Sequence, residues 1–164
     1  MILVTLGTQD KQFMRLIETI ENLVITKIIK EDVVVQAGNT EYKSEYLKII
    51  DFTPYDEFEN LIKNCSLLIT HGGVGSIIAG LKLNKVVIAV PRLKKYNEHE
   101  NDHQLQIVKS FAQKKYILAV ENLDTLPNAL KKSKKFKPEK YESNTQNMIN
   151  TVRTAINEIS NKKL

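Results

Sequence analysis

Six residues near the middle of the chain carry the clearest chemical signal in the sequence. Positions 71–76 read His-Gly-Gly-Val-Gly-Ser and directly follow the apolar run Leu-Leu-Ile at 67–69. Glycines let a backbone approach an anion closely, and the first N–H groups of a following helix have no partner within that helix. These free donors and the partial positive charge of a helix N-terminus favour bound phosphate. The passage therefore predicts a nucleotide diphosphate site, although His71 could instead only cap its own loop.

A second polar segment, at positions 91–104, admits two interpretations. His99, Glu100 and His103 have the spacing of zinc peptidases, in which two histidines one helical turn apart bind zinc and the glutamate activates water. The positions inside this motif are asparagine and aspartate rather than apolar residues, which argues against a zinc hydrolase. The alternative is a polar loop at the start of a helix, whose short side chains hydrogen-bond the hydroxyl groups of a sugar.

The elements that position these segments alternate along the chain. Short apolar, β-branched runs predict strands at residues 2–6, 33–37, 47–52, 67–70, 86–90 and 116–120, with helices between them. This pattern is typical of a Rossmann-like α/β fold, a parallel sheet with helices on both faces. In such sheets ligands bind beyond the carboxyl ends of the strands. Five loops, at 7–9, 38–40, 52–53, 71–76 and 92–104, are therefore expected to meet at one edge.

Composition narrows the class of protein. The chain has 164 residues, of which 42% are hydrophobic and 26% charged, as expected for one compact domain. No apolar run reaches the roughly 20 residues needed to span a bilayer, and residues 1–4 do not resemble a signal peptide. The single cysteine, Cys65, excludes an internal disulfide, suits a reducing cytoplasm and is expected to pack in the core.

The C-terminal part differs in character from the rest. Lysines gathered at 131–137 supply much of the net charge of +5 and suit either an anionic membrane face or a solvated linker. We expect no nucleic acid, because no aromatic residues that could stack on bases are interleaved with them. The expected organisation is a domain over 1–130, a basic linker over 131–140, and an amphipathic helix over 141–164 that packs on the domain or on a partner. Its apolar stripe consists of Met148, Ile149, Val152, Ile156 and Ile159.

Taken in order, residues 1–8, 71–76 and 91–104 resemble the family 28 glycosyltransferases. The resemblance covers residues 1 to about 120 and is to the donor-binding, C-terminal half of a two-domain GT-B enzyme. It is strongest to stand-alone catalytic subunits of split glycosyltransferases. These include the cytosolic subunit of the UDP-GlcNAc transferase of dolichol-linked oligosaccharide assembly and bacterial counterparts in capsule and exopolysaccharide synthesis. Residues 91–104 look most like the bacterial subunits.

The resemblance implies a UDP-sugar donor, no metal or other cofactor, and inversion at the anomeric carbon. In it, the first loop faces the diphosphate, Phe52 lies where the backbone reads uracil, and the last polar residues of 91–104 bind sugar hydroxyls. The predicted substrate-binding residues are Gly7, Thr8, Gln9, Phe52, His71, Gly72, Gly73, Gly75, Ser76, Arg92, Glu98, Asn101, Asp102, His103 and Gln104. His71 is also the candidate catalytic group, stabilising the departing diphosphate together with the helix N-terminus. Related enzymes often bind ribose with a glutamate where this chain has Ala79, so another side chain such as Glu98 is expected to replace it.

The resemblance also implies a membrane-anchored partner subunit that supplies the acceptor-binding half and the catalytic base. The acceptor would be a polyprenyl-diphosphate-linked sugar, and the chain would be cytoplasmic and peripheral at the inner face of the cell membrane. Galactose, glucuronate, glucose and N-acetylglucosamine all fit such a site, and the isolated chain could form a homo-oligomer. The alternative function is a non-catalytic, UDP-binding regulatory subunit.

Overall fold

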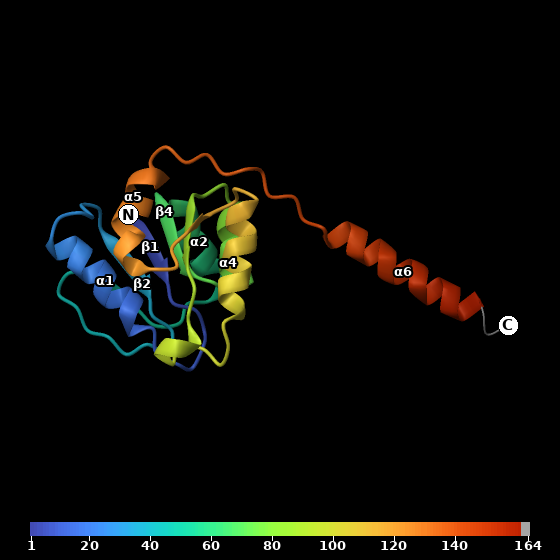
Figure 1. Ribbon diagram of the computed structural model, residues 1–164, viewed down its shortest axis with the longest axis horizontal. Helices are drawn as coiled ribbons and strands as arrows, with labels where there is room; N and C mark the ends of the chain where they lie inside the picture. Colours follow the sequence, from blue (N-terminus) through green and yellow to red (C-terminus); the bar gives the residue numbers. More distant parts are fainter. Residues whose placement is uncertain (162–164) are drawn as a thin grey trace.

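The computed structural model describes residues 1–161, in which strands and helices alternate along the chain (Figure 1). The strands are β1 (Ile2–Thr5), β2 (Val33–Gln36), β3 (Lys48–Ile50), β4 (Leu67–His71), β5 (Val87–Val90) and β6 (Leu118–Ala119). The helices are α1 (Met14–Ile25), α2 (Tyr55–Asn64), α3 (Val74–Lys82), α4 (His103–Gln113), α5 (Leu126–Ser133) and α6 (Thr145–Asn161), with 3-10 turns η1 (Lys94–Tyr96) and η2 (Leu123–Thr125). Each strand overlaps the range predicted from its apolar run.

All the strands pair in parallel, in the order β3-β2-β1-β4-β5-β6, which confirms the predicted Rossmann-like sheet. From the central strand β1 the chain adds β2 and β3 on one side. It then returns to add β4, β5 and β6 on the other side. The loops after β1 and β4 therefore run apart at the carboxyl edge of the sheet. A crevice at such a reversal of strand order is the usual ligand site of this fold class.

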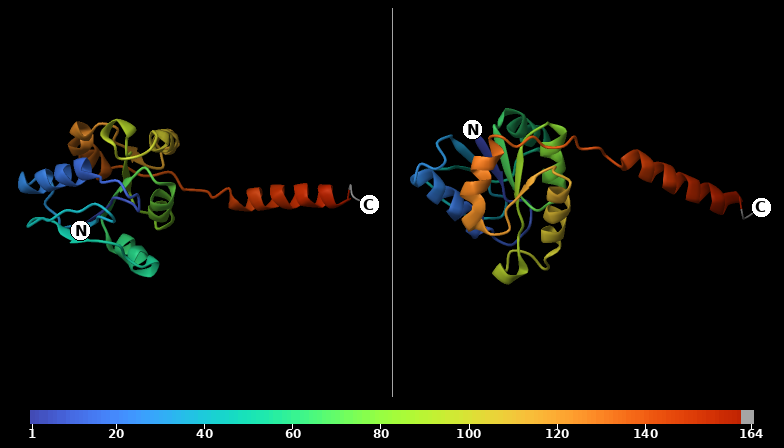
Figure 2. Two further views of the ribbon diagram at one scale, coloured as in Figure 1. Left: turned by 90° about the horizontal axis from the view of Figure 1, so that it is seen from below. Right: turned by 45° about the horizontal axis from the view of Figure 1, so that its top comes forward.

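Both faces of the sheet are buried, because successive strand residues point to opposite sides and nearly all are aliphatic. Helices α1 and α5 cover one face, and α2, α3 and α4 cover the other (Figure 2). Examples are Leu16 and Leu130 on the first face and Ile62, Ile77 and Val108 on the second. Burying each such side chain stabilises the fold by roughly 1.5–3 kcal/mol. The two packed layers hold the strand ends, and hence the loops at the carboxyl edge, in place.

The segment after α5 departs from the predicted basic linker over residues 131–140. Helix α5 continues to Ser133, because lysine is a good helix former and the apolar side of the helix packs on the sheet. Further on, Tyr141 stacks on α4, with its ring centroid 6.4 Å from that of Phe111. The chain therefore leaves the domain after Tyr141, and the helix predicted from residue 141 begins at Thr145.

Helix α6 extends away from the domain in every view (Figures 1 and 2). The side chains of its apolar stripe are between 44% and 61% exposed. Packing on its own domain, one of the two arrangements expected for this helix, is therefore not what the structure shows. None of the helices within residues 1–161 is long and apolar enough to cross a lipid bilayer. Residues 162–164 of the predicted helix lie outside the described residues.

Candidate functional site

A cavity of about 420 Å³ lies at the carboxyl ends of β1, β2 and β4, beside the first turn of α3. Its lining consists of Gly7, Thr8, Gln36, Thr53, Tyr55, Phe58, His71, Gly73, Gly75 and Ser76. The structure thus brings together six of the residues predicted to bind substrate, from two loops far apart in the sequence. They surround the crevice that the strand order creates.

The imidazole of His71 lies between Gly7 and Gly73. A Cβ on Gly7 would lie 2.6 Å from Nε2 of His71, and a Cβ on Gly73 would overlap the same nitrogen. Gly7 also has a φ of +84°, a conformation that residues with a side chain rarely adopt. Both glycines are therefore required by the position of the ring, which brings Nε2 to the glycine-lined side of the cavity.

The N-terminus of α3 points its unpaired backbone donors toward this cavity. Gly73 is the N-cap residue and offers no side chain to cap the first turn, which also contains no acidic residue. Gly75 and Ser76 line the cavity, and no protein atom lies within 4 Å of the position of a Cβ on Gly75. Free amides, a helix dipole and open space together form a site suited to an anion.

His71 is neutral at physiological pH. Burial and, to a smaller extent, the positive charge of Arg92 together lower its pKa to about 4, while a hydrogen bond to the backbone of Thr5 acts in the opposite direction. Thr70 Oγ1 lies 3.4 Å from Nδ1 of the ring. His71 therefore offers the cavity a hydrogen-bonding nitrogen and no formal positive charge.

Arg92, predicted to contact substrate, is instead a fully buried side chain, with 0% exposure. Its guanidinium donates to the backbone carbonyl oxygens of Leu6 (2.8 Å), Lys11 (2.6 Å) and Glu98 (3.2 Å). Burial lowers its pKa to about 10, which leaves it charged at neutral pH. The guanidinium donors are engaged by the backbone of these loops and do not reach a ligand.

Glu98, expected to replace the missing ribose-binding glutamate, is also buried, at 3% exposure. Its carboxylate accepts two hydrogen bonds from Arg15, both at 2.9 Å, and one from the backbone N–H of Leu93 at 3.0 Å. This bidentate pair ties the loop after β5 to α1. The expectation for Glu98 is wrong, because helix α1 packs beside the loop and supplies its partner.

Ala79 lies on α3 and is partly buried against the core formed with α2 and α4. The residues lining the cavity, all within the described part of the chain, include no carboxylate. Their uncharged polar side chains are Gln36, Thr53 and Tyr55, together with those of the predicted loops. Thr53 lies in the predicted loop at 52–53 but was not among the predicted binding residues, and Gln36 and Tyr55 were not identified from the sequence. Gln36 is the one polar residue that closes the aliphatic strand β2.

Gln104 is the third polar or charged residue of the second polar segment that the structure buries, at 5% exposure. In contrast, Asn101, Asp102 and His103 are exposed beside it, at the start of α4. Asp102 accepts a hydrogen bond from the backbone N–H of Lys94 at 2.8 Å, so the exposed half of the segment is also an ordered loop. Of the residues of this segment predicted to bind substrate, only these three have exposed side chains.

The zinc-peptidase geometry does not form. Helix α4 begins at His103, so His99 and Glu100 lie in the preceding loop rather than one turn earlier on the same helix. Glu100 pairs with Lys11 at 2.6 Å. Within residues 1–161 no group of three histidine, cysteine or acidic side chains is placed to hold a metal ion.

Phe52 and Gln9 lie outside the cavity lining. Phe52 is 56% exposed at the end of β3 and, with Gly38, borders a neighbouring surface hollow. Gln9 hydrogen-bonds only its neighbour Asp10 among the side chains described, at 3.0 Å. Both lie on loops at the carboxyl edge, so the predicted convergence of these loops holds even where the side chains do not meet.

The parallel sheet and its glycine-lined crevice define a Rossmann-like domain of the type that forms the C-terminal half of GT-B glycosyltransferases. Residues 1–159 match the model of the glycosyltransferase family 28 C-terminal domain, and the chain belongs to this family. It is 32% identical over 77 residues to the UDP-N-acetylglucosamine transferase subunit ALG13 of Candida albicans. That match covers 47% of this chain and 25% of the relative, so the chain corresponds to a small part of that protein.

Solved structures show the same fold. An NMR structure of ALG13 superposes with a TM-score of 0.56 and 19% identity over 87% of this chain and 89% of that one. The crystal structure of the glycosyltransferase SnogD from Streptomyces nogalater gives 0.51 and 16% identity over 84% of this chain and 40% of that one. The kitacinnamycin glycosyltransferase gives 0.59 and 17% identity over 80% and 33%.

Proposed function

We propose that this chain is the donor-binding, catalytic subunit of a two-chain inverting glycosyltransferase that transfers a hexose from a UDP-sugar. The observation that carries the proposal is the cavity in which Gly7, His71 and Gly73 meet the open N-terminus of α3. Membership of the family supports transfer of a glycosyl group. The curated relative is described as a subunit of a UDP-N-acetylglucosamine transferase, which supports both the nucleotide and the division into subunits.

Cleavage of the bond between sugar and diphosphate leaves negative charge on the departing UDP. The amides at the start of α3 are fixed donors for that charge, and Nε2 of His71 lies next to them. One such preorganised donor typically contributes about 3–4 kcal/mol to stabilising the transition state. Because the pKa of His71 is about 4, its contribution is a hydrogen bond rather than a full charge.

Recognition of the hexose is assigned to the exposed half of the polar segment, Asn101, Asp102 and His103. Uracil is assigned to the side of the cavity toward Phe52, and the ribose to Gln36, Thr53 or Tyr55 in place of the absent carboxylate. Lys94 and Lys95 are exposed at the same edge and would pair with the carboxylate of a glucuronate donor. A panel of UDP-sugars therefore discriminates between a charged and a neutral hexose.

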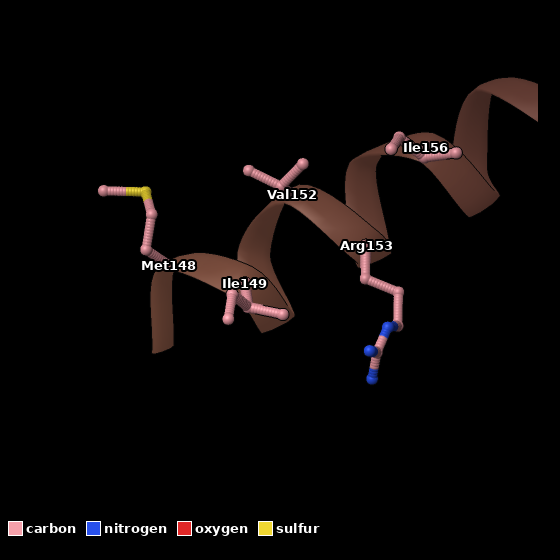
Figure 3. Close-up of a pocket in the computed structure, with 5 residues that line it drawn as sticks. All are labelled: Met148, Ile149, Val152, Arg153 and Ile156. Carbon is pink, nitrogen blue, oxygen red and sulfur yellow. The ribbon is translucent and has the colours of Figure 1, made fainter. Parts of the chain in front are cut away.

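The apolar stripe of α6 is assigned to a membrane-anchored partner that supplies the acceptor-binding half and the base. Its exposed residues Met148, Ile149, Val152 and Ile156 lie along one side of the helix, with Arg153 beside them (Figure 3). Such a stripe has no stabilising role in an isolated helix and is typical of a docking surface. The proposed acceptor is a polyprenyl-diphosphate-linked sugar in capsule or exopolysaccharide synthesis, at the inner face of the membrane.

The direct test is UDP binding, measured by calorimetry and by protection against thermal unfolding. Wild type is expected to bind UDP. Gly73→Val, which forces His71 out of its place and fills the cradle, is expected to lose detectable binding while remaining folded. Val74→Ala is the matched control, because Val74 starts the same helix, is 40% exposed and does not line the cavity. UDP binding by Gly73→Val equal to wild type would contradict the proposed site.

Turnover separates the catalytic subunit from a regulatory one. The chain is co-expressed with a candidate membrane-anchored partner. Hydrolysis of each UDP-sugar, or transfer from it, is then measured as the amount of UDP released. Turnover that requires both chains and is lost in Gly73→Val supports the proposal. UDP binding without turnover beside every candidate partner would instead identify a non-catalytic nucleotide-binding subunit.

A further inference from the structure

Gln104 joins two of the loops that surround the cavity. Its side-chain oxygen Oε1 accepts the backbone N–H of Gly72 and the backbone N–H of Arg92, both at 3.1 Å. Gly72 belongs to the glycine loop after β4, and Arg92 follows β5. A single buried oxygen therefore fixes the distance between the two loops, and its own exposure of 5% leaves little of the residue accessible to a ligand.

The backbone of the glycine loop also packs directly on Gln104. A Cβ on Gly72 would lie 2.7 Å from Cβ of Gln104 and 3.0 Å from its carbonyl oxygen, closer than real Cβ atoms approach. The missing side chain allows the N–H of Gly72 to reach Oε1. The hydrogen bond from the Gly72 N–H and the close packing both fix the position of the glycine loop against α4.

Arg92 extends the connection to the third loop. Its Nε and Nη2 donate to the carbonyl oxygen of Leu6 at 3.1 and 2.8 Å, and its Nη1 donates to that of Lys11 at 2.6 Å. Leu6 immediately precedes Gly7, one of the two glycines that enclose the ring of His71. The guanidinium is a rigid planar fork, so these carbonyls cannot shift independently of one another.

The outer side of Arg92 is closed. The Phe13 ring packs on it, with its centroid 4.8 Å from the guanidinium carbon, and Arg15 lies 5.4 Å from the same ring. Arg15 in turn donates to the carbonyl oxygen of Pro91 at 3.1 Å and forms the bidentate pair with Glu98. Arg92 is therefore held in one orientation and cannot turn outward to a ligand.

From this network we infer that Gln104, through Oε1, and Arg92, through its guanidinium, are positioning residues for the donor diphosphate. Gln104 holds the glycine loop through the N–H of Gly72, and Arg92 holds the chain just before Gly7, so that Gly7 and the free amides at the start of α3 keep their positions around His71. Backbone donors stabilise developing charge only when they are fixed in place, and a displacement of about 1 Å can greatly reduce their effect. The inference rests on the proposed function, because that function supplies the diphosphate as the ligand.

The test compares UDP with UDP-sugars in Gln104→Met. This substitution removes the acceptor at nearly constant volume and leaves the N–H groups of Gly72 and Arg92 without a partner. We expect the affinities for UDP and for every UDP-sugar that wild type binds to fall together, by roughly tenfold, with their ratio unchanged. Gln106→Met, the same change at an exposed position of α4, is the control and is expected to bind as wild type does.

A spectroscopic readout follows the loop without any ligand. In Gln104→Met the amide proton resonance of Gly72 is expected to move upfield, as its hydrogen bond is lost, while the spectrum stays that of a folded domain. Gln104→Asn withdraws the amide by one methylene group and is expected to have the same effects, which covers the case in which Gln104→Met does not fold.

The outcomes separate the two levels of the proposal. If wild type binds UDP and the variants lose affinity only for UDP-sugars, Gln104 contacts the sugar and the inference is overturned. Unchanged UDP affinity in a folded variant would also overturn it, because the network would then support the fold alone. Failure of wild type to bind UDP would reject the proposed function, whereas the Gly72 resonance would still report whether Gln104 holds that amide.

Discussion

The loops at the carboxyl edge of the sheet and the C-terminal helix α6 differ in how far contacts within the chain bury and pair their side chains. At the edge, charged side chains such as Arg92 and Glu98 are buried, and within the described residues every fully buried side-chain nitrogen or oxygen has a hydrogen-bond partner. On α6, large apolar side chains are exposed and pack on no other element within residues 1–161 (Figure 1). The carboxyl edge is therefore ordered by contacts within this chain, whereas α6 is the surface that we propose a second molecule covers.

This contrast separates a region ordered by its own contacts from one that is not. The buried side chains that support a preorganised site need hydrogen-bond partners within the protein, because unpaired buried groups cost about 1–3 kcal/mol each. An amphipathic helix without a core to cover gains no such stability. Substitutions are therefore expected to have large effects at the edge, moderate effects at the junction and almost none on the stability of the domain beyond it.

The largest effect is expected at Arg92. Arg92→Met leaves the carbonyl oxygens of Leu6, Lys11 and Glu98 buried without their donor. We expect the free energy of unfolding in urea to fall by about 3–5 kcal/mol, as for the breaking of other buried charged networks. Lys95→Met, a similar change at an exposed cation of the same loop, is expected to lower the free energy of unfolding by less than about 0.5 kcal/mol. Equal effects of the two would show that the edge is no more ordered than the surface.

A second, smaller effect depends on pH. The pKa of His71 is near 4 in the folded chain and near 6.5 when unfolded, so the unfolded state binds this proton more readily. The stability contributed by the neutral ring is complete above about pH 6.5, falls as the pH decreases and levels off below 4. Between pH 7 and 4.5 wild type should lose about 2 kcal/mol more than His71→Gln, in urea unfolding at each pH.

His103→Gln, a substitution at an exposed histidine of α4, is the control for this measurement and is expected to follow wild type. Parallel curves for wild type and His71→Gln would mean that the ring is solvated. The site would then be more open than the close packing of Gly7 and Gly73 around the ring indicates.

Much of the carboxyl edge could be predicted from the sequence, because two periodic signals determine it. Continuous aliphatic strands predict a parallel sheet, and a parallel sheet places the loops after its strands at one edge. The glycines at 72, 73 and 75 indicate where the backbone approaches a ligand or another part of the chain closely. That His71 itself is the close neighbour of both Gly7 and Gly73 requires coordinates, because the contact with Gly7 joins two loops that lie far apart in the sequence.

The roles of charged residues in the second polar segment could not be predicted in the same way. Arg92, Glu98 and Gln104 look like the exposed residues around them. Phe13 and Arg15, at the start of α1 and much earlier in the chain, pack on Arg92 and pair with Glu98, and Gln104 packs on Gly72 of the glycine loop. No local pattern encodes these contacts. The linker was misplaced for the opposite reason, since its lysines suggest solvated coil although lysine also extends a helix readily.

At the junction, Tyr141 is the last side chain that anchors the chain to the domain. Its ring packs at 6.4 Å from Phe111 and 5.6 Å from Tyr116, measured between centroids. Tyr141→Ala is expected to lower the free energy of unfolding by about 1 kcal/mol, the usual value of such aromatic pairs. Tyr46→Ala, at a tyrosine that is 56% exposed, should have a smaller effect. No difference between them would place the boundary of the domain before Tyr141.

The smallest effect is expected beyond the junction. A chain truncated after Ser143 lacks α6, whose apolar side chains bury nothing against the domain, so its urea unfolding should match that of the full chain within about 0.5 kcal/mol. UDP affinity should also be unchanged, because the cavity lies among residues 7–76. Capture of the membrane-anchored partner should be lost, and Val152→Asp in the full chain should lose it as well. Asn150→Asp, which introduces the same charge outside the apolar stripe, should retain it.

A truncated chain that is destabilised by several kcal/mol would mean that α6 packs on the domain in solution, and the contrast between the buried edge and the exposed helix would fail. Partner capture by the truncated chain would instead move the docking surface onto the domain.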